Sequence, residues 1–108
     1  MKTVRRYRRR TVRVSVEHVS EIRGPRREVA TTLGAGGLFI QTDDPLPKGA
    51  RLLMRFQLPG GDRLHEIEGR VVWRRRPNDP GSYSPGMGIE FTDAAAAASL
   101  ARELEMLK

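Results

Sequence analysis

Stretches in which apolar and polar residues alternate recur along most of this chain, and turn-forming residues separate them. In the clearest stretch, Leu52, Met54, Phe56 and Leu58 occupy every second position. A period of two is typical of a strand that buries one face. About six such strands are expected, beginning near Val12, Arg26, Leu38, Leu52, His65 and Gly86. Short strands with frequent turns indicate an antiparallel barrel or sandwich.

The alternation also predicts which side chains form the interior. Within a barrel closed over residues 12–92, the residues expected to point inward include Val14, Met54, Val71 and Ile89. Three aromatic residues are also expected to face the core: Phe56, Trp73 and Phe91. In the second strand, the residues expected to share one face are Val29, Thr31 and Leu33.

A helix is predicted after the last strand, over residues 94–107. Thr92 or Asp93 can cap its first turn. Leu100 and Leu104 lie on one apolar stripe, so we expect them to dock the helix on the barrel.

The composition suits a small barrel with a thin core. Of the 108 residues, 38% are hydrophobic and 31% are charged, and cysteine is absent. The absence of cysteine excludes disulfides, a thiol nucleophile and cysteine-ligated metals. No apolar run approaches the length of a membrane span, and no apolar segment typical of a signal peptide opens the chain. We therefore expect one cytoplasmic domain.

Positive charge is concentrated at the start of the chain, where residues 1–11 are expected to form a flexible arm ahead of a barrel and helix over 12–108. The first 13 residues contain seven basic residues and no acidic one: Lys2, Arg5, Arg6, Arg8, Arg9, Arg10 and Arg13. The rest of the chain has 13 basic and 13 acidic residues, so the net charge of +7 belongs to this segment. Arginine binds phosphate through two parallel hydrogen bonds, which indicates that the arm itself meets an anion.

The sequence gives no support to catalysis or to a metal site. His18 and His65 lie on predicted strands without a nucleophile motif, and we interpret them as satisfied or exposed strand histidines. Asp43 and Asp44 precede Pro45 at a strand end and are interpreted as a solvated turn. No phosphate-binding loop, hydrolase motif or metal-binding motif occurs. We expect a binding module that is not an enzyme and holds no cofactor.

Three motifs occur in a fixed order along the chain. The arm contains two overlapping RxxxR patterns, Arg5 with Arg9 and Arg6 with Arg10. The glycine-rich residues 32–37 run directly into the apolar residues 38–40. A GxGxxF pattern over residues 86–91 precedes the predicted helix.

This arrangement resembles the PilZ domain family over nearly the whole chain. That family opens with RxxxR, continues with (D/N)xSxxG before a strand, and often ends with a GxGxxF-like strand and a helix. The resemblance implies an all-β fold: a six-stranded antiparallel β-barrel with one C-terminal α-helix, here as a stand-alone domain. It also implies a site for cyclic di-GMP, made of Arg5, Arg6, Arg9, Arg10, Thr32, Gly34 and Gly37.

The second motif departs from the family pattern at two of its three fixed positions. Thr32 replaces Asp or Asn, Gly34 replaces Ser, and only Gly37 matches. A carboxylate or amide can accept from the guanine N1–H and N2–H₂ edge, whereas a Thr hydroxyl offers a single acceptor and Gly offers none. Each missing bond costs about 1–3 kcal/mol, so two losses would weaken binding by roughly two decades.

The resemblance implies a cyclic di-GMP receptor or adaptor in bacterial second-messenger signalling that acts on a downstream protein partner. Binding would order the arm across the barrel, and Tyr7 and Trp73 can add stacking. Two alternatives stay open. The first is a degenerate PilZ-like protein-interaction module without nucleotide binding, which Thr32 and Gly34 favour. The second is a small basic nucleic-acid-binding barrel, which is disfavoured because the aromatic residues are few.

Overall fold

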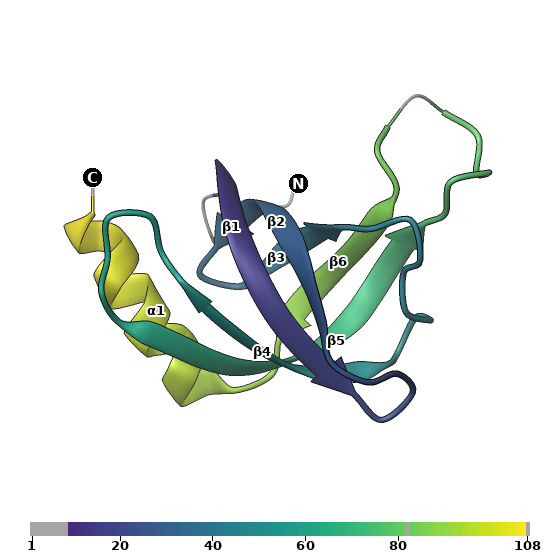
Figure 1. Ribbon diagram of the computed structural model, residues 1–108. Helices are drawn as coiled ribbons and strands as arrows, with labels where there is room; N and C mark the ends of the chain where they lie inside the picture. The colour runs from purple at the N-terminus through teal and green to yellow at the C-terminus, as the bar shows by residue number, and fades with distance from the viewer. Residues whose placement is uncertain (1–8, 82, 108) are drawn as a thin grey trace, which may run out of the picture.

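Six antiparallel strands close into a barrel, and one helix follows them (Figure 1). The computed structural model describes residues 9–81 and 83–107. Its elements are β1 (Arg9–Ser20), β2 (Arg26–Gly34), β3 (Gly37–Gln41), β4 (Arg51–Gln57), β5 (Leu64–Arg75), β6 (Gly86–Phe91) and α1 (Ala94–Met106). The strands follow the order β1-β2-β3-β6-β5-β4 around the barrel, and β4 pairs with β1 to close it. The predicted barrel with a C-terminal helix is confirmed.

The first strand begins earlier than the sequence indicated. Arg9 already pairs with Gly34 of β2, so residues 9–11 extend the barrel wall and do not belong to the arm. The flexibility expected of the arm concerns residues 1–8, which lie outside the described residues.

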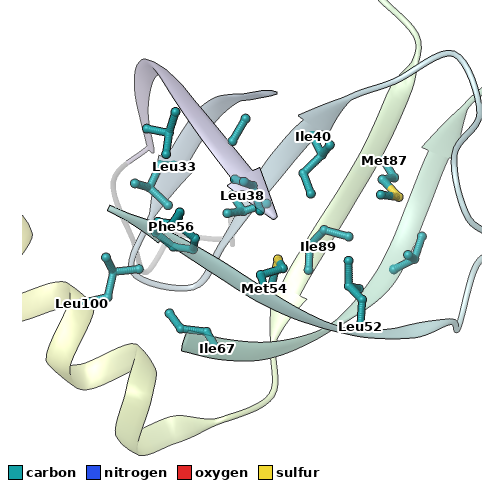
Figure 2. Close-up of a cluster of buried hydrophobic side chains, with 14 of the residues drawn as sticks. Leu33, Leu38, Ile40, Leu52, Met54, Phe56, Ile67, Met87, Ile89 and Leu100 are labelled. Atoms are coloured by element: carbon teal, nitrogen blue, oxygen red, sulfur yellow. The ribbon is translucent and has the colours of Figure 1, made fainter. Parts of the chain in front are cut away.

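The core fills the barrel with aliphatic side chains and one aromatic ring (Figure 2). All four residues expected inside are buried: Val14, Met54, Val71 and Ile89. Phe56 is buried among them, and Phe91 packs half-buried against the same cluster. Fully burying each large aliphatic side chain contributes about 1.5–3 kcal/mol, so this interior supplies most of the fold's stability.

The helix closes one end of the barrel. Asp93 caps it by accepting a hydrogen bond from the Ala96 backbone at 3.0 Å, as one of the two expected caps. Leu100 is fully buried and Leu104 packs beside it, which confirms the predicted docking stripe. His65 of β5 also hydrogen-bonds Glu103 of α1. No helix in the described part of the chain has the length and apolar character to cross a bilayer.

The prediction that Trp73 faces the core is wrong. A bulge in the β5–β6 pairing lies between Val71 and Trp73, so the alternation shifts and the indole turns to the outer surface, where it is 37% exposed. A second bulge, between Ala30 and Thr32 in the β2–β3 pairing, likewise breaks the expected face of β2. Its buried residues are Ala30, Leu33 and Gly34, whereas Val29 and Thr31 are only half-buried.

Trp73 lies on an aromatic surface outside the barrel. Its ring stacks on Phe39 of β3, with the centroids 5.3 Å apart and the planes at 21°. The Arg75 guanidinium lies 5.2 Å from the Trp73 centroid and 4.9 Å from that of Tyr83. Gly88 of β6 makes room for the indole, because a Cβ there would lie 2.2 Å from Trp73 Nε1.

At the opposite end of β1, a carboxylate network ties β1 to β2 and to the loop after β3. Glu28 Oε1 lies 2.8 Å from His18 Nε2, and its other oxygen accepts from Arg26 at 2.8 Å and from the Thr42 hydroxyl. Burial would raise the pKa of Glu28. The hydrogen bonds from Thr42 and His18 and the charge of Arg26 outweigh burial and hold this pKa below its ordinary value.

We predict that Gly88→Ala destabilises the protein by about 1–3 kcal/mol, because the new methyl group displaces the indole. Trp73 is the sole tryptophan, so its near-ultraviolet circular dichroism and fluorescence should change together with the urea midpoint. The matched control is Gly24→Ala, whose Cβ would meet nothing within 4 Å. An unchanged spectrum and midpoint in Gly88→Ala would contradict the packing described here.

A second prediction concerns the stability of the protein at acidic pH. A carboxyl whose pKa is depressed by folding stabilises the protein above its unfolded pKa, and that contribution disappears as the pH falls through the lower folded value. Glu28→Gln should therefore lower the free energy of unfolding at pH 7 by about 1–3 kcal/mol. The loss should shrink below the ordinary glutamate pKa near 4.5. Chemical denaturation from pH 7 to pH 3 measures both effects, with exposed Glu21→Gln as control. Parallel pH profiles for wild type and Glu28→Gln would refute the role of Glu28.

Candidate functional site

Two rows of residues cross the barrel wall where β1 begins. We call the first the glycine row: Arg9, Gly34, Gly37, Glu90 and Arg70, from β1, β2, β3, β6 and β5 in turn. The second is the aromatic row: Thr11, Thr32, Phe39, Gly88 and Trp73, from the same five strands. The two rows are two residues apart along each strand, roughly 7 Å, except on β5, where the bulge makes the separation three residues. The rows therefore bring the start of β1 and the β2–β3 turn onto one continuous surface.

The four arginines of the expected site differ from one another in where they lie. Arg5 and Arg6 lie outside the described residues. The backbone of Arg9 pairs with that of Gly34, directly beside the β2–β3 turn. The side chain of Arg10 runs to the end of α1, where Nη1 lies 3.5 Å from the carbonyl oxygen of Leu107. A cation is favourable at the negative end of a helix, so Arg10 is engaged there.

Thr32 and Gly34 stand side by side with the start of β1. The Thr32 hydroxyl is buried and has no hydrogen-bond partner among the described residues. A buried hydroxyl without a partner is costly, so this position suits an acceptor or donor supplied from outside the described chain. Gly34 has no positive φ, since only Gly49, Gly60 and Gly81 do among the described glycines.

Gly37 has a structural role that sequence reasoning missed. It pairs with Glu90 at the start of β3, and a Cβ there would lie 2.0 Å from the Ile89 carbonyl oxygen. Any side chain at this position would therefore push β3 away from β6. The close approach of the two strands thus requires glycine at this position.

A hollow of about 590 Å³ adjoins the glycine row. Ala35 and Gly36 of the β2–β3 turn form one side, and Ala97 and Ala98 of α1 are part of the other. Glu90 borders the hollow and is paired with Arg70, whose Nη2 donates to Glu90 Oε1 at 3.0 Å. Both side chains are about half exposed, at 48% for Arg70 and 53% for Glu90.

The structure gives both histidines a partner inside the barrel. His18 pairs with Glu28 and His65 with Glu103, and both imidazoles are almost fully buried. This agrees with the interpretation of satisfied strand histidines. Over residues 9–81 and 83–107, no group of three or more acidic or histidine side chains gathers in a way that could hold a metal ion.

Comparisons with known proteins identify the fold. Among solved structures, the chain superimposes on the Bacillus subtilis inhibitor of motility MotI (DgrA) with a TM-score of 0.74 and 25% identity, over 94% of this chain and 49% of that one. The chain thus spans about half the length of MotI. The PilZ domain of CeSA from a cellulose-synthesising bacterium gives a TM-score of 0.64 at 20% identity, covering 91% of this chain and 98% of that one.

A third structure is the PilZ domain of YcgR from Escherichia coli with c-di-GMP. It gives a TM-score of 0.71 at 14% identity, over 97% of this chain and 92% of that one. The search of curated proteins gave no match. A family model described as the PilZ domain matches residues 3–106, which is almost the whole chain. With the barrel, its helix and the ordered motifs in agreement, the chain belongs to the PilZ domain family.

Proposed function

We propose that this chain is a cyclic di-GMP receptor that acts as an adaptor in bacterial second-messenger signalling, by binding and not by catalysis. One observation carries the proposal: β1 and β2 pair in a register that sets Arg9 opposite Gly34 and Thr11 opposite Thr32. The residues that follow the arginine arm therefore lie beside the second motif, which supports a site shared by the two. The related YcgR domain, whose structure includes c-di-GMP, supports the same ligand for this chain.

The arginine arm supplies the charge for a dianionic ligand. Of the two RxxxR registers, we favour Arg5 with Arg9, because the Arg10 guanidinium is engaged at the end of α1. Paired arginines would neutralise the two phosphates and can also donate to guanine O6 and N7.

The aromatic row supports stacking of a guanine base. Trp73 presents its ring at the surface, stacked on Phe39 and flanked by Arg75. Base–aromatic stacking contributes about 1–3 kcal/mol per base. This position on the outer surface, in one row with Thr32 and Phe39 and paired with Gly88, makes Trp73 a better stacking partner than a core residue would be.

Thr32 and Gly34 set the expected affinity. The Thr32 hydroxyl offers one acceptor in place of a carboxylate or amide, and Gly34 offers no side chain at all. We therefore expect binding about two decades weaker than with both motif side chains present. On binding, the arm would become ordered across the barrel face and form a surface for a downstream protein partner in the cytoplasm.

Calorimetry with cyclic di-GMP at near-physiological salt tests the proposal. Arg9→Ala should weaken binding by about tenfold or more, because it removes charge-assisted hydrogen bonds to the ligand. Thr32→Asn combined with Gly34→Ser should strengthen binding by roughly ten- to a hundredfold. Serine at position 34 meets no φ conflict, since that glycine has no positive φ.

Thermal melting of each variant checks the fold, and Arg102→Ala on the exposed side of α1 serves as the charge-matched control for Arg9→Ala. If the wild type and a well-folded double variant both fail to bind at high micromolar cyclic di-GMP, the receptor function is refuted. The degenerate interaction module would then be the better account of the arginine arm.

A further inference from the structure

The hollow beside the glycine row, called the slot below, lies between the β2–β3 turn and α1. One wall is the backbone of Ala35 and Gly36 in the β2–β3 turn, and the other includes Ala97, Ala98 and Ala101 of α1. In Figure 1, β6 leads into α1, and at the end of β6 the Phe91 N–H donates to the Gly36 carbonyl oxygen of the turn at 2.9 Å. Small side chains line most of the slot, and Glu90 and Thr92 add polar groups. Its volume of about 590 Å³ is in the range of small-molecule sites.

Among the side chains that line the slot, Glu90 is the charged one and Thr92 adds a hydroxyl, while Arg70 lies at its border as the partner of Glu90. Glu90 Oε1 accepts from Arg70 Nη2 at 3.0 Å, and no described residue donates to Oε2. The other N–H groups of Arg70 also have no acceptor in the described part of the chain. The pair therefore presents a donor from Arg70 followed by two acceptor oxygens from Glu90.

This order is the complement of one nucleobase edge. The Watson–Crick edge of guanine carries the O6 acceptor, then the N1–H donor, then the N2–H₂ donor. Adenine presents N6–H₂, then the N1 acceptor, then C2–H, so it would place donor against donor and acceptor against acceptor. We propose that the slot is a guanine subsite, in which Arg70 donates to O6 and the Glu90 oxygens accept from N1–H and N2–H₂. This inference rests on the proposed receptor function.

The assignment accounts for two features that the motif left unexplained. First, Glu90 stands directly across from Gly37, so it supplies the paired acceptors that neither Thr32 nor Gly34 can offer. Second, Arg51 lies directly opposite Arg70 on the neighbouring strand. Like charges in that position oppose one another, and a bound anion relieves the repulsion. The positive charge of these two arginines also offsets repulsion between Glu90 and a dianionic ligand.

Titration with cyclic di-GMP and cyclic di-AMP tests the subsite. Glu90→Gln keeps the shape of the side chain but turns one acceptor into a donor, so cyclic di-GMP affinity should fall by about tenfold or more. Cyclic di-AMP affinity should stay the same or rise, and the preference for guanine should shrink accordingly. The matched control is Glu66→Gln, because Glu66 is also half exposed and pairs across strands with Arg55 at 3.4 Å.

A second pair of variants tests the slot itself. Ala98→Leu places a larger side chain in the slot and should weaken cyclic di-GMP binding by about tenfold or more, whereas Ala95→Leu, exposed on the same helix and outside the slot, should not. Both keep a residue with high helix propensity. If the wild type binds cyclic di-GMP while Glu90→Gln and Ala98→Leu bind within twofold of it, the subsite is wrong and the receptor function stands. If the wild type binds neither dinucleotide, both are refuted.

Discussion

The close approach of β3 and β6 is the constraint on which the outer surface of this barrel depends. Two glycines make it possible: Gly37 lies against the Ile89 carbonyl, and Gly86 against the Ile40 carbonyl and the Phe39 ring. A third, Gly88, lies against the Trp73 indole of β5. A Cβ at any of them would lie between 2.0 and 2.3 Å from these neighbours. Because the strands can approach, the rings of Phe39 and Trp73 can lie flat on β6, and the turn before Gly37 comes next to Glu90. The glycines that belong to the family's motifs thus shape the wall on which a ligand would rest.

The barrel could be predicted from the sequence because most strands bury every second side chain. The alternation of Leu52, Met54, Phe56 and Leu58 is reproduced in the structure without a break, and the Leu100 stripe identified the docking face of α1. The prediction failed at two bulges, which insert a residue without leaving a reliable trace in the pattern. Both failures lie on the candidate surface: one turns Trp73 outward, and the other sets Thr32 beside Phe39.

The candidate site was only partly accessible from sequence. The ordered motifs identified the family and the segments that meet, but a motif fixes neither side-chain direction nor cross-strand neighbours. Arg70 and Glu90 are 20 positions apart in the chain and become a pair only through the β5–β6 register. The same holds for Trp73, Arg75 and Phe39. A Glu inside a GxGxxF pattern gives no sign that it borders a hollow, because the other wall comes from the helix that follows it.

The side chain of Arg10 has a consequence for how the basic segment is used. It reaches the Leu107 carbonyl at the end of α1, while the neighbouring Arg9 pairs with Gly34 beside the turn. Part of the positive charge at the start of the chain therefore links β1 to the C-terminal end of α1. More arginines in this segment would therefore not raise the number of ligand contacts in proportion. A substitution of Arg10 would act directly on the contact with α1, and only indirectly on nucleotide binding.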